Sequence, residues 1–376
     1  MSDAEAAPAP DDRILGVPAA GLIIALLVVR VVVAILLIAW SGRIEDEGIL
    51  RYDRVAASPV TPYRNFQVEW MPVQTAVVQA VGGRGGAATA AGVTVVAVVA
   101  DAAVAAALVR GWGLRTAANY LLLGLPLLGV AYARLDLIAV AFAAWAFAGT
   151  RRGRDGPAGV ALGLAALSGL WAAFLLPWVT LRRRRRPTLV WAAAVLAAGG
   201  AAWFLVGGPK GPMQVLSYRG ATGWDVQSTV GSLLQVFTDG ATFLEGGILR
   251  IGFASSATRT AILALVLGAT AMAWLRWRSD GDPASRPALG ITATILALSP
   301  TFPAEWTAIL VPWTALMWDE DRRIALAAVV AIALTGVLTA VSPAAESTAL
   351  TTAIVLVRQV ALMAVAGWAL VLGRRA

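Results

Sequence analysis

The chain has 376 residues, of which 59% are hydrophobic, and a net charge of +8 without any cysteine or histidine. Soluble domains average about 45–50% apolar residues, so this composition excludes an ordinary soluble domain and predicts a polytopic membrane protein. The missing residue types exclude disulfides, thiolate chemistry, His-ligated metals and His acid–base catalysis, so neither a metal site nor a cofactor is expected. The positive charge lies in loops beside apolar runs, where the positive-inside rule explains it without a nucleic-acid partner.

The apolar runs predict one membrane domain over residues 14–376, preceded by a disordered cytoplasmic tail over residues 1–13 that is rich in Ala, Pro and Asp. The first run, Ile14–Trp40, is long enough to cross a hydrocarbon core of about 30 Å and lacks a clear cleavage site, which indicates a retained span. The further candidate spans are Ala88–Val109, Ala117–Ala133, Leu135–Gly149, Leu189–Val206, Thr260–Trp277, Ala288–Ser299, Ala304–Trp318, Ile324–Val341 and Thr348–Leu372.

The apolar stretch 158–181 lies between two arginine clusters, at 151–154 and 182–186, that both look cytoplasmic. A single crossing would separate the clusters, so we predict a hairpin of two short helices, each about 18 Å long, with its tip at Ser168–Gly169. Both termini are then cytoplasmic, and residues 41–86 and 207–259 form two long outside loops. The predicted fold is an all-α polytopic bundle of about 10–12 transmembrane helices with short or re-entrant helices.

The first outside loop carries an acid group, Glu45, Asp46 and Glu47, with Asp53 a turn or two later. These acids are either a solvated end of the first span or a general base at the membrane surface. Other polar features are the Pro62–Phe66 and Glu69–Pro72 strings, an ion pair of Arg134 with Asp136, and the Tyr218–Ser228 segment. Asp101 in the second span is a candidate functional acid by its depth, or a partner of Arg30 in the first span.

Four strings in chain order resemble those of the polytopic glycosyltransferases of family 87, which have a GT-C fold and use polyprenyl-phosphate sugar donors. They are Asp46 and Tyr52 followed by PYRNFQVEWMP; ARLDLIAV, RRGR and AGVALGLAALSGLWAAFLLPW; GWDVQSTVGSLL; and SPTFPAEWTAILVPW. The resemblance covers most of the chain, from the first span to about Trp318. It implies a GT-C-like bundle with a long first extracytoplasmic loop.

The resemblance also implies the activity: a sugar, mannose by default, passes with inversion from a polyprenyl-phosphate donor to a glycolipid or glycan acceptor of the cell envelope. The enzyme is expected in the plasma membrane, in contact with the lipid bilayer, with its active site on the extracytoplasmic side. Asp46 is the expected general base, with Glu47, Glu45 and Asp53 as alternatives, and Arg64, Arg134 and Arg219 are the candidates for the donor phosphate. The substrate-lining candidates are Tyr52, Tyr63, Glu69, Trp70, Asp136, Ser168, Trp224, Asp225, Ser228 and Thr301.

The strings depart from the family pattern at some positions. Members usually carry a Lys at the hairpin tip, where this chain has Ser168–Gly169, and Gln227 and Thr301 replace a Glu and a Gln. A catalytically degenerate member that acts as an envelope-assembly partner therefore stays open as an alternative. A transporter or flippase is a third reading, since Asp101, Arg30 and Arg358 are intramembrane charges, but no internal repeat supports it.

Overall fold

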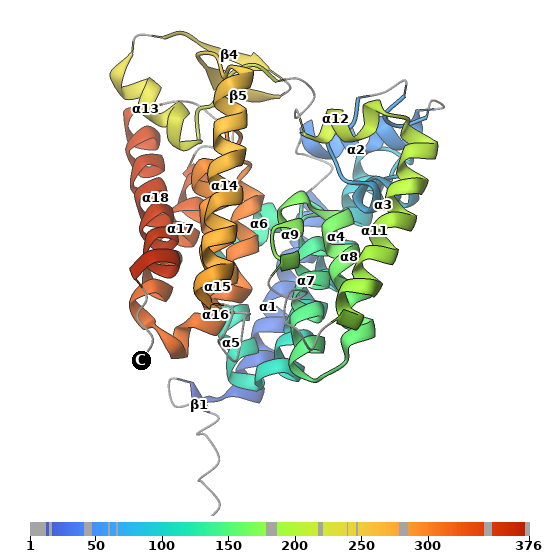
Figure 1. Ribbon diagram of the computed structural model, residues 1–376, viewed down its shortest axis with the longest axis vertical. Coiled ribbons are helices and arrows are strands. Elements are labelled where there is room, and N and C mark those ends of the chain that lie inside the picture. Colours follow the sequence, from blue (N-terminus) through green and yellow to red (C-terminus); the bar gives the residue numbers. More distant parts are fainter. Residues whose placement is uncertain are drawn as a thin grey trace, which may run out of the picture.

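The computed structural model describes residues 13–14, 17–40, 47–58, 61–64, 67–177, 186–216, 221–238, 240–245, 247–277, 285–341 and 348–372. Long helices stand side by side as a bundle, with shorter elements gathered at one end (Figure 1). Six of the described helices are long and apolar enough to cross a membrane. They are α1 (Ala19–Trp40), α4 (Gly86–Trp112), α11 (Arg186–Gly207), α14 (Ser256–Trp277), α17 (Arg322–Val341) and α18 (Ala349–Gly367).

The other apolar segments are shorter or broken. A 42° bend separates α5 (Leu114–Leu123) from the segment Leu125–Ala131, and this pair makes a seventh crossing if it is counted as one span. Six or seven of the predicted crossings are thus full-length, and short helices take the place of the rest, as the predicted all-α bundle allows. The short helices are η1 (Leu125–Leu127), α6 (Leu128–Ala131), α7 (Leu137–Arg151), α8 (Asp155–Ser168), α9 (Leu170–Ala173), α15 (Arg286–Leu298), η2 (Ala304–Leu310), α16 (Val311–Glu320) and η3 (Trp368–Leu372).

The first span begins later than predicted, at Ala19 rather than at Ile14. Residues Arg13–Ile14 (β1) pair antiparallel with Val17–Pro18 (β2) just before it. Pro18 fits this boundary because proline lacks a backbone N–H and is tolerated at the start of a helix but not inside one.

Helices α8 and α11 begin at the same end of the bundle, as the hairpin prediction requires. The Thr188 hydroxyl lies 3.1 Å from Asp155 Oδ1 at this shared end. The predicted tip of the hairpin coincides with an observed break in the helix, since α8 ends at Ser168 and Gly169 is extended (φ −157°). The second arm is not the predicted dozen-residue helix in its described part, because α9 has 4 residues and residues 178–185 lie outside the described part.

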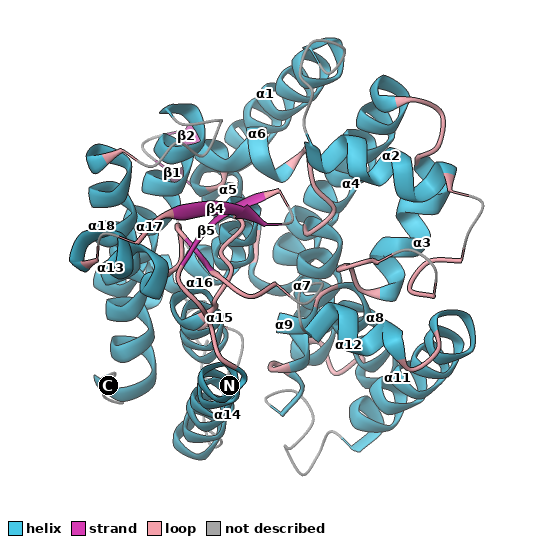
Figure 2. Cartoon of the chain, turned by 90° about the horizontal axis from the view of Figure 1, so that it is seen from above, coloured by secondary structure: helices cyan, strands magenta, loops and turns pink. Residues whose placement is uncertain are grey.

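The described part of the first predicted outside loop, residues 41–86, folds into two helices, α2 (Glu47–Ala57) and α3 (Pro72–Val81). Helix α12 (Lys210–Leu216) lies beside α11 (Figure 2), at the same end of the bundle as α2 (Figure 1). Gln214 of α12 ties the two outside loops together: its Nε2 donates to the Tyr63 carbonyl at 2.7 Å, and its Oε1 accepts from Val68 N at 2.9 Å.

The second predicted outside loop, residues 207–259, carries in its described part a small antiparallel sheet that the all-α prediction missed. Its strands are β3 (Trp224–Asp225), β4 (Thr242–Glu245) and β5 (Ile248–Ile251), in the order β3-β5-β4. In the register, Trp224 pairs with Ile251 and Phe243 with Arg250. Helix α13 (Thr229–Phe237) follows β3 and is capped by Ser228, whose Oγ accepts from Gly231 N.

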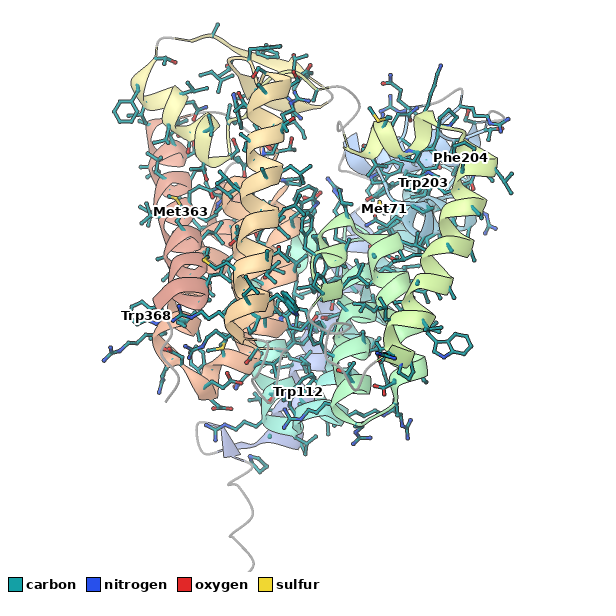
Figure 3. All side chains as sticks on the ribbon, viewed as in Figure 1. Met71, Trp112, Trp203, Phe204, Met363 and Trp368 are labelled. Carbon is teal, nitrogen blue, oxygen red and sulfur yellow. The ribbon has the colours of Figure 1, made fainter. Side chains whose placement is uncertain are left out.

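Aromatic side chains mark the two ends of the bundle. Trp203 and Phe204 lie at the end that carries α12, and Trp112 and Trp368 lie at the opposite end (Figure 3). Such belts are typical of the two membrane–water interfaces. The described chain starts, at β1, and finishes at the same end, the one opposite α12 (Figure 1).

Candidate functional site

Helix α2 holds the aromatic and acidic residues of the first predicted outside loop in position. Tyr52 and Val55 are buried on one face, as the 3.6-residue period of an amphipathic helix requires. The Tyr52 ring packs on Trp70 with 4.7 Å between centroids. Arg51 clamps Glu69, since its Nε and Nη2 lie 2.9 and 2.8 Å from the two carboxylate oxygens. The string that contains Glu69 and Trp70 is thereby folded back onto α2.

Arg134 lies against the first turn of α2. A Cβ atom added to Gly48 would stand 2.6 Å from Arg134 Cζ, so the guanidinium approaches this helix where there is no side chain. Its Nε is 3.3 Å from Glu305 Oε1 of η2, and the Arg134 side chain remains 23% exposed. The cation therefore lies beside the start of α2, which follows the predicted base in the sequence.

Two ionisable groups beside Arg134 have pKa values above their ordinary values. Burial and the neighbouring Glu305 raise the pKa of Asp136 to about 7, against the opposing effects of Arg134 and of a hydrogen bond from Gln74. A carboxyl with a pKa near neutrality is suited to proton transfer or to donating a hydrogen bond. Burial likewise raises the pKa of the Tyr52 phenol, which stays protonated at neutral pH.

Asp53 organises the turn before α4. Its Oδ1 accepts hydrogen bonds from Gly83 N at 2.9 Å, from Gly85 N at 3.1 Å and from the Thr89 hydroxyl at 2.6 Å. A general base must reach a substrate hydroxyl, whereas this oxygen is already engaged by three donors. The geometry gives Asp53 a structural task and disfavours it as the base.

Tyr63 and Arg64 also make internal contacts. Tyr63 is buried with a positive φ of 66°, and its hydroxyl lies 2.7 Å from the Trp70 carbonyl. Arg64 Nη2 donates to the Leu205 carbonyl at 2.7 Å, where it caps the exposed end of α11. Of the three arginines predicted for the phosphate, Arg134 is therefore the one that the described structure places beside α2.

The predicted residues of the second outside loop form a separate, buried junction. Asp225 accepts from Gln227 N at 2.8 Å and from Phe302 N at 2.9 Å, and its own N–H donates to the Pro300 carbonyl at 3.0 Å. Burial raises the pKa of Asp225 to about 6, against these hydrogen bonds and nearby arginines. The turn that ends at Ser228 is thus joined to the 299–302 turn.

Two buried arginines complete this junction. Arg250 donates to the Gly223 carbonyl at 2.8 Å and reaches the Thr301 hydroxyl at 3.3 Å. Arg358 Nη2 of α18 donates to the Gln227 carbonyl at 2.6 Å. Because Trp224, Asp225, Ser228 and Thr301 are all buried, they connect loops in this structure and are not surfaces open to a ligand.

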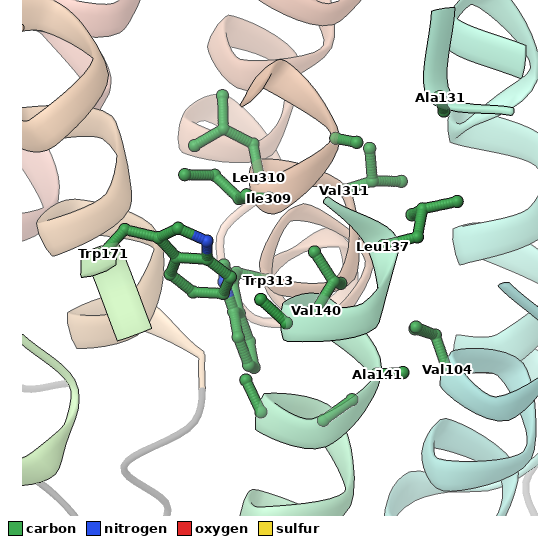
Figure 4. Packing of buried hydrophobic residues seen from close by; sticks show 14 of the residues in the cluster. Val104, Ala131, Leu137, Val140, Ala141, Trp171, Ile309, Leu310, Val311 and Trp313 are labelled. Carbon is green, nitrogen blue, oxygen red and sulfur yellow. The ribbon is translucent and has the colours of Figure 1, made fainter. Parts of the chain in front are cut away.

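The hairpin tip lies near the start of α7, since a Cβ atom added to Gly169 would stand 2.9 Å from the Cβ of Ala139. Ser168 is buried, and its hydroxyl donates to the Leu164 carbonyl at 2.7 Å. Trp171, just past the tip, lies beside Ile309, Trp313 and Val140, so α9, η2, α16 and α7 share one apolar cluster (Figure 4). The side chains at the described tip therefore contribute packing, and none of them is a cation.

Some of the predicted residues cannot be placed. Glu45, Asp46 and Arg219 lie outside the described residues, and Glu47 is described only as the first residue of α2. Conversely, the site contains groups that the sequence did not single out. Glu305 stood inside the SPTFPAEW string without being selected, while Gln74 gave no signal in the sequence.

The arrangement as a whole offers a cation, several carboxylates and a neutral phenol at one end of a membrane bundle. Such groups can neutralise an anionic leaving group, hydrogen-bond sugar hydroxyls and accept a proton. Within the described residues, no group of three His, Cys, Asp or Glu side chains is placed to hold a metal ion.

Comparison with known proteins gives a family match. The model of glycosyltransferase family 87 matches residues 56–300 of the chain. The crystal structure of ArnT from Cupriavidus metallidurans in the apo state aligns with a TM-score of 0.48 and 17% identity, over 94% of this chain and 76% of that one. The same protein bound to undecaprenyl phosphate gives 0.49 and 16%, over 94% and 77%. None of the curated proteins compared with the chain matches it.

Proposed function

The chain belongs to glycosyltransferase family 87, and we propose that it transfers a sugar, mannose in the first instance, from a polyprenyl-phosphate donor. The acceptor is a glycolipid or glycan of the cell envelope, and the site opens on the extracytoplasmic side of the plasma membrane. The transmembrane bundle supports a lipid-linked donor, because the polyprenyl tail stays in the bilayer while the sugar reaches the outer end of the helices.

One observation carries this proposal: the Arg134 guanidinium lies against Gly48, two residues from Asp46. A transferase of this kind needs a base and a phosphate-binding cation within the span of one sugar, and this contact supports such a pairing. Glu305 Oε1 lies 3.3 Å from Arg134 Nε, so a donor phosphate would bind the other N–H groups of the guanidinium or displace that carboxylate.

The chemistry follows from these groups. Asp46 removes the proton of the acceptor hydroxyl as its oxygen attacks the anomeric carbon from the face opposite the phosphate. The new glycosidic bond forms as the bond from the anomeric carbon to the phosphate oxygen breaks, so the configuration inverts. Arg134 stabilises the negative charge that develops on the departing polyprenyl phosphate.

The test measures transfer of label from radiolabelled polyprenyl-phosphate mannose into membrane lipids by purified protein. Removing a general base typically costs about 10²- to 10⁴-fold, so Asp46→Asn should lower kcat by that order with normal expression. Arg134→Gln should lower kcat/KM for the donor by roughly 10- to 150-fold, which corresponds to a lost charged hydrogen bond of about 1.5–3 kcal/mol. Full activity of Asp46→Asn would exclude Asp46 as the general base, and Glu47 would then be the next candidate.

Ser168 supports a second candidate, a catalytically degenerate member that acts as an assembly partner. The described tip of the hairpin carries a buried, internally bonded hydroxyl where family members usually carry a lysine. Wild-type protein without activity on any polyprenyl-phosphate sugar tested would favour this candidate. Restored transfer in Ser168→Lys would then identify the missing cation as the reason.

A further inference from the structure

Helix α13 lies in the second outside loop, yet it runs alongside the membrane-spanning helix α18. The Thr229 hydroxyl at its start is 3.2 Å from Gln359 Oε1, and Gln235 Oε1 near its end accepts from the Thr352 hydroxyl at 3.0 Å. The span begins at Ala349. At 1.5 Å per residue, Thr352 lies about 4.5 Å and Gln359 about 15 Å below that start. Helix α13 therefore descends through the depth that the end of α18 occupies.

The outward face of α13 is apolar, unlike that of a helix in water. Its buried residues are Gly231 and Ser232, whereas Leu233, Val236 and Phe237 are 41%, 51% and 78% exposed. These three residues follow the i, i+3, i+4 spacing of one helical face. Because Val230 and Leu234 pack inward against the apolar cluster of this loop, α13 is apolar on both sides, which is typical of a helix buried in protein or lipid.

The exposed face of α13 also carries no charge, since the sequence from Thr229 to Phe237 contains no ionisable residue. Helix α18 is apolar on its exposed side as well, which lies away from Thr352 and Gln359: Leu350, Val357 and Val360 are between 55% and 63% exposed. Figure 1 shows α13 beside the upper part of α18, so the two apolar faces lie at one level. Water or a polar protein partner would leave these apolar side chains without apolar contacts, whereas the bilayer that surrounds α18 provides them.

We infer that α13 is embedded in the membrane leaflet at the end of the bundle that carries α2 and α12. Leu233 contacts the acyl chains, and Phe237 lies nearer the headgroups, where amphipathic helices and aromatic side chains settle. The bilayer thereby holds the Ser228 turn against α18, and with it the junction to Thr301. This lipid contact is independent of the transferase activity proposed above.

The chain is well suited to a direct test, because it has no cysteine of its own. Single variants Leu233→Cys and Phe237→Cys are labelled with an environment-sensitive NBD fluorophore in nanodiscs that hold one copy of the protein. Leu265→Cys, on the lipid-facing side of α14 and 59% exposed, is the bilayer control. Arg84→Cys, in the exposed turn before α4, is the aqueous control.

We expect both α13 labels to emit near the wavelength of the Leu265 label and to resist quenching by iodide. Nitroxide lipids should quench both, with the Phe237 label more sensitive to nitroxides close to the headgroups and the Leu233 label to deeper ones. Emission and iodide quenching like those of the Arg84 label would overturn the inference. Water access in single-copy discs that disappears in two-copy discs would also overturn it, because the face would then belong to a second copy of the chain.

Discussion

Within the bundle, Arg30 and Asp101 form an ion pair with an Nε–Oδ2 distance of 2.6 Å. Tyr120 and Tyr132 each donate to the same carboxylate, at 2.5 and 2.6 Å. Burying a charge costs much free energy unless its hydrogen-bonding capacity is filled, and here three donors fill the capacity of Asp101. The sequence left open whether Asp101 is a functional acid or the partner of Arg30, and the pairing with Arg30 is confirmed.

The two tyrosines provide a matched pair of variants, because only Tyr132 belongs to the loop that carries Arg134. Tyr120→Phe and Tyr132→Phe each remove one bond to Asp101 and should lower stability similarly, by about 0.6–2 kcal/mol. Tyr132→Phe should in addition lower kcat/KM for the donor by roughly 2- to 10-fold, because Arg134 loses its fixed position beside the departing phosphate. Steady-state kinetics and thermal unfolding in nanodiscs measure the two effects.

Equal kcat/KM values for the two tyrosine variants would contradict a positioning role for Tyr132. If Arg134→Gln has no effect on kcat/KM either, the assignment of Arg134 to the donor phosphate is wrong. A lowered kcat/KM in Arg134→Gln alone would limit Tyr132 to a structural role.

Asp136 should make stability depend on pH in a range where this chain has no histidine to titrate. Its folded-state pKa of about 7 lies above the ordinary value of 3.8, so the folded protein binds more protons than the unfolded chain between these values. The free energy of unfolding therefore falls as pH rises from 4 towards 7 and levels off above it. Asp136→Asn should show a smaller fall in Tm between pH 5 and pH 8.

Asp225, whose pKa is raised to about 6, contributes a fall of the same sign, which Asp136→Asn retains. The informative quantity is therefore the difference in Tm between wild type and variant at each pH. A constant difference from pH 5 to pH 8 would show that Asp136 titrates alike in the folded and unfolded chain.

Among the elements, α8 and α11 approach closely through glycine. A Cβ atom at Gly159 would stand 2.3 Å from the Thr188 carbonyl oxygen, whereas one at Gly200 of α11 would meet nothing within 4 Å. Gly159→Ala should therefore destabilise the protein by about 1–3 kcal/mol through overpacking. Gly200→Ala should be neutral or slightly stabilising, because alanine favours a helix more than glycine does. Thermal unfolding of the two variants in detergent measures the contrast, and equal midpoints would contradict this packing.

The elements also show which features a sequence can predict. The long spans follow from apolar runs, which are local, and the break at Ser168–Gly169 follows from where the arginine clusters lie. The β3-β5-β4 sheet was missed because its strands have 2 to 4 residues and pair only through tertiary contacts. Glu305 was missed for the same reason: its partner Arg134 is distant in the sequence, and only the fold brings the two together.

At the scale of the whole molecule, the path of the chain through the bundle predicts which loops share a side of the membrane. Arg151 stacks on Trp112 with 5.4 Å from Cζ to the ring centroid, so α4 and α7 end together, away from the turn that holds Arg84. The start of α11 lies beside the start of α8 through Thr188 and Asp155. In sealed vesicles, an impermeant maleimide should therefore label Arg154→Cys and Arg186→Cys from the same side. Arg84→Cys should react only from the opposite side.

These positions are informative because Arg84, Arg154 and Arg186 are exposed and no native cysteine competes for the reagent. A hairpin returns the chain to its starting side, whereas a full crossing of the stretch 158–181 would move Arg186 to the side of Arg84. Labelling of Arg186→Cys together with Arg84→Cys would therefore exclude the hairpin. It would also reverse every later helix and so separate Glu305 from Arg134, which are 3.3 Å apart in this structure.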